Sequence, residues 1–380
     1  MPGLSAADVV VIGAGAAGLA LACRLGEQGT RGVVLVEAPP GENRAPDRTW
    51  CSWGTDDYWD DAVSARWDRV DVVPHAGTAR TYDLAPLRYS MIRSADYERV
   101  ASARLAQTDV RRVEVLVSGV DDGRETAVVH GAGLTPEGLA ARWVFDTRPT
   151  APARTGRVAL LQHFRGWFVR TAEDAFDPSV ASLMDFRPPQ PTRGVAFGYV
   201  LPTSRREALV EYTQFSRSGM SRVQYDAELA RYCALLGLPA YEVVAAEQGA
   251  IPMTDAPFPR RVGRRVFRLG AAGGATRPST GYTFSAAQRQ AAAVALALVE
   301  GRDPCPPPAY PRRHLQMDAL LLRALDSGAI DGADFFARLF EQHPPDLVLR
   351  FLDGATTAGE DLAVMASAPK AAMVRTALRR

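Results

Sequence analysis

A glycine pattern between a β-branched run and a helical pattern is the feature that most constrains this chain. Asp8 to Ile12 predicts a buried strand, the letters "GAGAAG" follow it, and apolar residues then recur at helical spacing up to Gly29. The segment "GVVLVEA" predicts a second buried strand that ends at Glu37. Residues 8–38 therefore have the order and length of a βαβ unit, the start of an α/β fold that binds a dinucleotide.

The residues of this unit have separate predicted roles. Gly13 permits the tight turn, Gly15 lets the backbone approach a pyrophosphate, and Gly18 lets the helix pack closely on the sheet. The helix N-terminus then faces the phosphates. Glu37, nineteen residues after Gly18, is placed to bind a ribose hydroxyl. Because the strand, the helix and the terminal acid agree, the motif predicts a bound dinucleotide.

The composition indicates an ordinary soluble globular protein. The chain has 380 residues, 47% of them hydrophobic and 23% charged, and its formal net charge of +1 shows no overall bias toward nucleic acid. Val9 to Cys23 is apolar, but it is shorter than the ~20 residues that a spanning helix needs. Met1 to Ala7 carries no Lys or Arg, so neither a membrane span nor a secretory signal is expected.

Neither the cysteines nor the histidines predict a metal site. The four cysteines have no zinc or disulfide spacing, which fits a reducing cytoplasm. His163, beside Phe164 and Trp167, is expected to be packed rather than catalytic. The remaining histidines have no partner at useful spacing, and they are His75, His130, His314 and His343.

Three further segments are expected near the nucleotide or its pocket. Arg44 to Asp61 is polar and rich in tryptophan, and it predicts a long connection over a pocket, or else surface aromatics on a loop. The segment "ARWVFDTRP" predicts a buried strand that ends at Asp146, where a loop returns to a nucleotide. A glycine-rich turn from Gly270 to Gly281 precedes a long alanine-rich helix, and it predicts a second anion-binding loop.

Residues 160–215 predict a strand-rich region whose last two strands form a hairpin around "TSRRE". Leu209, Glu211 and Phe215 then share one face of the second strand. A buried carboxylate without a partner is costly, so it pairs with a cation or becomes protonated. Glu211 is therefore either a solvent-facing residue paired with an arginine of the hairpin turn, or a neutral acid on an apolar face.

Several segments beyond the nucleotide motif resemble the flavin-binding lycopene cyclases, in the order of that family and over almost the whole length. They include "VVIGAGAAGLALA", "DRTWCSW", "VFDTRP", "LLQHFRGW", "YVLPTSRREALVEYTQFS", "QGAIPMTD" and "AGGATRPSTGYTF". The segments "RTWCSW", "QHFRGW" and "RPSTGYTF" are peculiar to this group. The match is therefore much more specific than the glycine pattern alone.

The resemblance implies a fold related to the aromatic hydroxylases, with an antiparallel sheet that roofs the substrate cavity. It divides the chain into a discontinuous Rossmann-type FAD-binding domain, a β-sheet substrate domain and a C-terminal helical region. These regions are expected at 1–70, 90–150 and 260–305 for the first, at 71–89 and 151–259 for the second, and at 306–380 for the third.

The resemblance also implies functional residues. The family's essential acid, on the strand after the hairpin, matches Glu211. The positions that match the cofactor site are Gly13, Gly15, Ala16, Ala17, Gly18, Glu37, Arg48, Trp50, Arg93, Asp146, Gly273, Gly274, Ser279, Thr280 and Gly281. Two positions depart from the family pattern. Ser52 replaces a bulky aromatic, and Arg277 replaces the His of plant-type members, so a proton role of that His is not transferable.

The activity implied by the resemblance is a non-redox cyclisation, of the intramolecular lyase class of isomerases. A ψ-end of lycopene or a related linear carotene is protonated, closes to a β-ring and loses another proton. Reduced FAD is the implied cofactor and NAD(P)H its reductant, and either Glu211 or the reduced flavin is the immediate proton donor. The residues leave open whether one or both ends react, and whether the ring is β, ε or γ.

A linear carotene is dissolved in the bilayer, so a cytoplasmic enzyme would have to contact the membrane surface as a peripheral protein. The segments "FFARLFEQ" and "LVLRFLDG" have the mixture of Phe, Leu and Arg expected of an interfacial surface. Helices that pack on the core would have the same composition. Both interpretations of these segments remain open at the level of the sequence.

Three alternative functions remain in the same fold: a flavin monooxygenase or reductase acting on a polyprenyl substrate, a cyclase of another terpenoid, and a carotenoid-binding protein without activity. Flavin hydroxylases usually carry an Asp-Gly pair in mid-chain and a Gly-Asp pair near the flavin. The corresponding places here contain "FDTRP" and "LGAAGG", which disfavours the monooxygenase.

Overall fold

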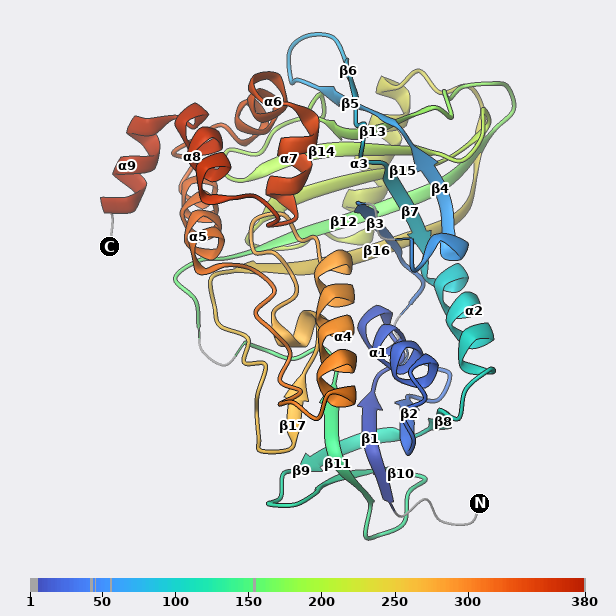
Figure 1. Cartoon of the computed structure of the whole chain (residues 1–380). Coiled ribbons are helices and arrows are strands. Elements are labelled where there is room, and N and C mark those ends of the chain that lie inside the picture. The colour runs from blue at the N-terminus through green and yellow to red at the C-terminus, as the bar shows by residue number, and fades with distance from the viewer. Residues whose placement is uncertain (1–5, 42–43, 45, 55–56, 153–154, 379–380) are drawn as a thin grey trace.

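The computed structural model describes residues 6–41, 44, 46–54, 57–152 and 155–378, and Figure 1 shows its three sheets and their covering helices. The first sheet has the strand order β8-β2-β1-β11-β10-β9, and β17 also pairs with β11. Its strands are β1 (Ala6–Ile12), β2 (Val33–Glu37), β8 (Arg111–Glu114), β9 (Leu116–Asp121), β10 (Ala127–Ala132), β11 (Leu139–Asp146) and β17 (Val266–Arg268).

The βαβ unit predicted from the glycine pattern is present. Helix α1 (Ala16–Glu27) joins β1 to the parallel strand β2, and it packs against α2 (Ser94–Leu105) and α4 (Phe284–Val299). Alternate residues of β1 pack in two different hydrophobic cores, because successive side chains of a strand point to opposite faces. Val9 and Val11 pack with α1, and Val10 and Ile12 pack with the strands β10 and β11. This burial on both faces explains the uninterrupted apolar run.

The second sheet has the order β16-β12-β15-β14-β13-β5-β6, and all its neighbours are antiparallel except β13 and β5. One face carries α3 (Arg222–Leu235) and the other packs on the C-terminal helices. Its strands are β5 (Arg69–Val73), β6 (Arg80–Asp83), β12 (Ala159–Thr171), β13 (Val180–Asp185), β14 (Val195–Pro202), β15 (Glu207–Ser216) and β16 (Tyr241–Thr254). The predicted hairpin is confirmed as β14 and β15, whereas the division into three domains stays a prediction.

The described residues of 44–61 form more regular structure than predicted. They include β3 (Thr49–Trp53) and the start of the 3-10 helix η1 (Asp60–Ala62), and β3 joins β7 (Tyr89–Arg93) and β4 (Val63–Trp67) in the third sheet. Trp53 donates to the carbonyl of Leu349 at 2.8 Å, and Trp59 donates to Gln288 at 2.6 Å. Both indoles are buried, so the predictions of an unpacked connection and of surface aromatics are wrong for these two residues.

The C-terminal region is helical, as predicted, with α5 (Arg312–Asp326), α6 (Gly332–Gln342), α7 (Pro345–Leu352), α8 (Ala358–Ser367) and α9 (Lys370–Leu378). Helices α6 and α7 cover one end of the second sheet (Figure 1). Phe336 and Phe340 of α6, and Val348 and Leu349 of α7, are buried in the same core as Phe215 of β15. The interfacial interpretation of these two segments is therefore wrong, because their apolar faces already pack inside the protein.

Candidate active site

A cavity of about 430 Å³ lies between the second sheet and the glycine-rich loop that precedes α4. Its walls come from β3, β12, β15, β16 and residues 271–284. Phe164, Leu201 and Leu209 give the cavity apolar surface, and Glu211 faces it from the middle of β15. The chain therefore brings the predicted acid and the predicted flavin loop to one cavity, although about 60 positions separate them in sequence.

Glu211 lies in an environment that favours its protonated form. Burial, together with the nearby carboxylate of Glu247, raises the pKa of Glu211 to about 8. Thr213, two residues along the same face, donates to one carboxyl oxygen of Glu211 at 2.7 Å. The solvent-facing alternative is wrong, because Glu211 lines the cavity and Arg206 of the hairpin turn pairs with Asp174 at 2.8 Å.

A second carboxylate, which the sequence did not reveal, shares this wall. Glu247 lies on β16 and is 7% exposed. In the strand register, Gly166 of β12 lies opposite both Glu211 on one side and Glu247 on the other. Directly opposed residues project to the same face, so both glutamates leave the sheet beside a residue without a side chain. The cavity thus contains an acid pair rather than a single acid.

The other polar groups around the pair hold their protons. Tyr199 of β14 and Tyr282 share a hydrogen bond of 3.1 Å between their hydroxyl oxygens. Burial raises the pKa of Tyr282 to about 12, that of Tyr199 well above its usual value, and that of the Cys51 thiol to about 12. These groups are neutral at physiological pH. Glu211, whose pKa is about 8, exchanges its proton at a pH closer to neutrality than these groups do.

The dinucleotide end has the geometry that the glycine pattern predicts. Gly13 has a φ of +99°, and a Cβ on Gly18 would overlap the carbonyl oxygen of Gly13. A Cβ on Gly15 would meet nothing within 4 Å, so the backbone there is open to a ligand. The N-terminus of α1 also lacks a side-chain cap and has no acidic residue in its first turn. Its free N–H groups therefore fit a pyrophosphate.

The predicted ribose contact, Glu37, already has partners. One carboxylate oxygen accepts from Arg44 at 2.8 Å, and the side chain also pairs with Arg112. Asp146, at the end of β11, pairs with Arg148 at 2.8 Å. Both carboxylates lie at strand ends beside the glycine turn, where a nucleotide would compete with these arginines.

The remaining predicted cofactor residues lie in three places. Ala16 and Ala17 begin α1, and the residues that line the cavity are Arg48, Trp50, Thr280 and Gly281. Those that contribute no cavity surface are Arg93, Gly273, Gly274 and Ser279. The Arg93 guanidinium lies 4.6 Å from the ring of Phe168, and Ser279 donates to Asp318 at 2.7 Å on the side of the loop away from the cavity.

The flavin end also has features that fit a bound ligand. Gly281 has a φ of +72°, and a Cβ there would overlap the side-chain oxygen of Gln162. That oxygen is buried and accepts no hydrogen bond within the described residues, although Gln162 lines the cavity. Because a buried acceptor normally has a donor, this position fits a ligand that carries an N–H or O–H group. The two glycine loops and this acceptor together fit FAD.

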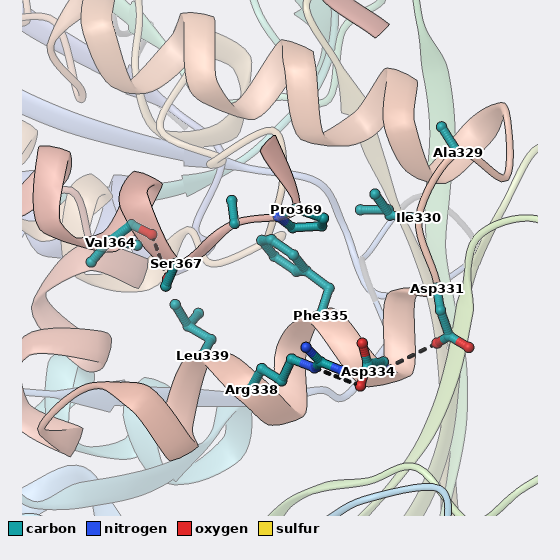
Figure 2. Close-up of a pocket in the computed structure, with 11 residues that line it drawn as sticks. Ala329, Ile330, Asp331, Asp334, Phe335, Arg338, Leu339, Val364, Ser367 and Pro369 are labelled. Carbon is teal, nitrogen blue, oxygen red and sulfur yellow. Dashed lines mark hydrogen bonds and ion pairs between the residues drawn. The ribbon is translucent and has the colours of Figure 1, made fainter. Parts of the chain in front are cut away.

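A second cavity, of about 260 Å³, lies between α6 and the residues that join α8 to α9 (Figure 2). Its ionisable side chains form hydrogen bonds with neighbours on α6: Arg338 donates to Asp334 at 2.8 Å, and Asp331 accepts from the backbone of Asp334 as the N-cap of that helix. None of the predicted site residues lines it. Unlike the larger cavity, it has no acid free to act and no glycine loop.

The histidines are structural. His163 is fully buried between Tyr225, at 2.7 Å, and Ser216, at 2.8 Å, as predicted. The expectation of no useful partner is wrong for His130 and His314, whose rings lie 2.9 Å from the carboxylates of Asp121 and Asp361. His314 and Asp361 are 47 positions apart, so their spacing gave no signal. Within the described residues, no group of three or more His, Cys, Asp or Glu is arranged to hold a metal.

Solved structures share the fold of this chain. A geranylgeranyl bacteriochlorophyll reductase-like protein from Thermoplasma acidophilum superimposes with a TM-score of 0.66 at 13% identity, covering 98% of this chain and 99% of that one. A flavin-dependent brominase superimposes with a TM-score of 0.65 at 14% identity, over 99% of this chain and all of the other. The chain thus has the same class of fold as these two proteins.

Within that class, the chain belongs to the lycopene cyclase family, whose model, described as "Lycopene cyclase protein", matches residues 8–378. It is 28% identical over 314 residues to an uncharacterized carotenoid cyclase from Deinococcus radiodurans, covering 79% of this chain and 73% of that protein. It is 26% identical over 316 residues to a chloroplastic neoxanthin synthase from Solanum lycopersicum. That match covers 77% of this chain and only 61% of the plant protein.

Proposed function

We propose that this chain cyclises the ψ-ends of lycopene or a related linear carotene to β-rings, without net oxidation or reduction. The observation that carries this proposal is the position of Glu211, an acid kept protonated in a partly apolar cavity of a lycopene cyclase family member. Protonating carbon requires a neutral acid in a place from which water is excluded. The raised pKa of Glu211 meets the first requirement, and Phe164, Leu201 and Leu209 in the same cavity supply apolar surface toward the second.

The chain's own residues support each part of this chemistry. Glu211 would donate its proton to the terminal trisubstituted alkene, which leaves a tertiary cation, and the next double bond would attack that cation to close the ring. Phe164, Leu201 and Leu209 bind the polyene and keep water from the cation. The neutral hydroxyls of Tyr199 and Tyr282 line the same cavity, and they add no basic group that would quench the cation.

The cofactor belongs to this proposal. FAD would be held by the α1 N-terminus at its pyrophosphate and by the loop from Ala271 to Phe284, with Gln162, near the flavin. Bound in its reduced form, it would supply a negatively charged ring system that stabilises cationic charge. NAD(P)H is proposed as the reductant that prepares this form and is not consumed in each turnover.

Product analysis tests the proposed function. Purified protein loaded with FAD, reduced with NADPH under nitrogen and given lycopene in liposomes, is expected to form cyclic carotenes of unchanged mass. NADPH consumption should stop once the flavin is reduced. In a parallel assay in air, oxygen uptake with an oxygenated product would indicate a monooxygenase, and under either condition a hydrogenated product would indicate a reductase. Lycopene recovered unchanged but bound would indicate a carrier.

Membrane contact is a further part of the proposal, with a different surface from the predicted one. Within the part of the chain that the structure describes, no helix is long and apolar enough to cross a bilayer. Helices α8 and α9 lie at the outer edge of the molecule (Figure 1) and expose Leu362, Met365, Val374 and Leu378 beside Lys370 and Arg375. Exposed apolar groups mixed with cations suit the cytoplasmic face of an anionic membrane.

Vesicle flotation tests this surface. The parent protein is expected to float with vesicles that contain anionic lipid, more strongly at low salt, because both apolar burial and charge contribute. The double variant Leu362→Asp with Leu378→Asp should remain in the dense fractions. Val223→Asp on α3, where Val223 is 79% exposed, is the matched control and should float like the parent. Equal flotation of the parent and the double variant would exclude α8 and α9 as the contact surface.

A further inference from the structure

Cyclisation to a β-ring needs a base as well as an acid, and we propose that Glu247 is that base. Its carboxylate accepts the proton that the ring-closed cation loses. This inference rests on the proposed function, and it assigns the second half of the reaction to a residue on a different strand from Glu211. Glu247 lines the same cavity as Glu211, so both carboxyl groups are within the space that the polyene end would occupy.

The sheet register brings the two carboxyl groups together. β15 and β16 flank β12, so the backbones of Glu211 and Glu247 are two strand spacings apart, about 10 Å. Gly166 lies between them with no side chain. A Cβ placed on Gly166 would lie 2.7 Å from Cδ1 of Leu209 and 3.5 Å from Oε2 of Glu211, so the Leu209 side chain and this carboxyl oxygen both lie over the glycine. Nothing from Gly166 therefore separates the two carboxyl groups.

The surroundings hold the negative charge on Glu247 rather than on Glu211. Burial raises the pKa of Glu247, but the hydrogen bond that it accepts from Thr49 at 2.8 Å and the guanidinium groups of Arg93 and Arg48 act against this rise. No arginine acts on Glu211 in the same way. Because two carboxylates at such a site do not both ionise freely, the one with the donor and the cations is the anion.

The groups that face Glu211 from other elements reinforce this difference. They are the thiol of Cys51 on β3, the hydroxyl of Tyr199 on β14 and the hydroxyl of Tyr282 before α4. All three are neutral at physiological pH. On its own strand, Glu211 receives only the hydroxyl of Thr213. The proton of the pair is thus stored on Glu211, ready for the first step.

The pair balances the reaction without an outside proton or electron. Glu211 gives its proton to the CH carbon of the terminal alkene, which leaves a tertiary cation on the dimethyl carbon, and the next double bond supplies the electron pair of the new ring bond to that carbon. The second tertiary cation then loses a proton from the ring-junction carbon to Glu247, and that C–H electron pair becomes the ring double bond. A proton that passes from Glu247 to Glu211 restores the starting state. The product is an isomer of the substrate.

Glu247→Gln tests this assignment, because the amide keeps the hydrogen bond from Thr49 but cannot accept a proton from carbon. Loss of a general base is expected to slow β-ring formation roughly 10²- to 10⁴-fold. A cation without its base should also lose a proton from another carbon or capture water, so ε- or γ-rings or a hydroxylated ring should appear. Glu247→Asp, which keeps a carboxylate, should retain β-rings and react faster than the Gln variant.

The possible outcomes separate the two proposals. If the parent forms no cyclic product, the proposed function fails. If the parent cyclises and Glu247→Gln gives only β-rings, at any rate, Glu247 is not the proton acceptor. Identical product mixtures from the Gln and Asp variants would also overturn the assignment. Glu242→Gln, on the same strand and in an exposed pair with Arg170, is the control and should match the parent. FAD absorbance checks that each variant is folded.

Discussion

Glu211→Gln is expected to bind FAD and the polyene normally and to leave the polyene linear. The substitution preserves the size of the side chain and its contact with Thr213, but it removes the proton that the reaction needs. A general acid typically contributes roughly 10²- to 10⁴-fold to a rate. Single-turnover chromatography of lycopene with reduced enzyme measures this loss.

Glu207→Gln is the matched control for that experiment. Glu207 begins the same strand, is partly exposed and pairs with Arg170 at 2.8 Å, so its amide should cyclise lycopene at nearly the parent rate. Because the pKa of Glu211 is raised to about 8, the protonated fraction and the parent rate should both fall as the pH rises through about 8. If Glu211→Gln turns over close to the parent rate with its FAD intact, the proton comes from another group, such as the reduced flavin.

Local sequence patterns were sufficient to predict the elements that form between residues close together in the sequence. The βαβ unit follows from a run of apolar residues, a glycine turn and helical spacing, all within about 30 residues. The hairpin of β14 and β15 follows from alternation on both sides of a polar turn. Glu211 could be singled out because a charged residue interrupts that alternation on the buried face.

Contacts between distant segments were the parts that the sequence did not reveal. Glu247 was not identified from the sequence as a site residue, because the neighbouring residues of β16 are largely exposed. Its position beside Glu211 depends on the register of both strands against Gly166. The sequence signal that could have identified Glu247 is an acid two residues before a glycine in the apolar segment "AAEQGAIPM". Trp53 was misjudged for the same reason, because its partner, Leu349, is 296 residues away.

Arg277, which replaces the histidine of plant-type members, has a structural role. Its side chain is fully buried and does not line the cavity. The Nε and one terminal nitrogen donate to Asp318 of α5 at 3.1 to 3.2 Å, and the guanidinium lies 5.0 Å from the ring of Phe351. Arg277 therefore fixes the cavity loop from behind. It has no position from which to perform the proton role of a histidine.

Asp318→Ala is consequently expected to destabilise the fold by roughly 3–5 kcal/mol, because it leaves the buried Arg277 guanidinium without its counter-charge. The ion pair is 0% and 2% exposed on its two sides, and Ser279 would also lose its acceptor. Removing both charges together, as in Arg277→Met with Asp318→Leu, should recover most of the loss, since apolar groups of similar volume replace a buried pair at little cost. Denaturant unfolding of each variant, free of FAD, measures the differences.

Comparison with an exposed ion pair decides whether burial of the Arg277–Asp318 pair causes the expected loss of stability. Arg338 and Asp334 of α6 form an i,i+4 pair at 2.8 Å whose side chains are both more than half exposed, so Asp334→Ala should cost no more than about 1 kcal/mol. If Asp318→Ala costs as little as Asp334→Ala, water reaches Arg277 and the pair does not anchor the loop. If the double variant is as unstable as Asp318→Ala, the loss comes from packing against α5 rather than from an unpaired charge. The predicted order, with the single Asp318 variant the least stable of the three, follows only from a buried and uncompensated guanidinium.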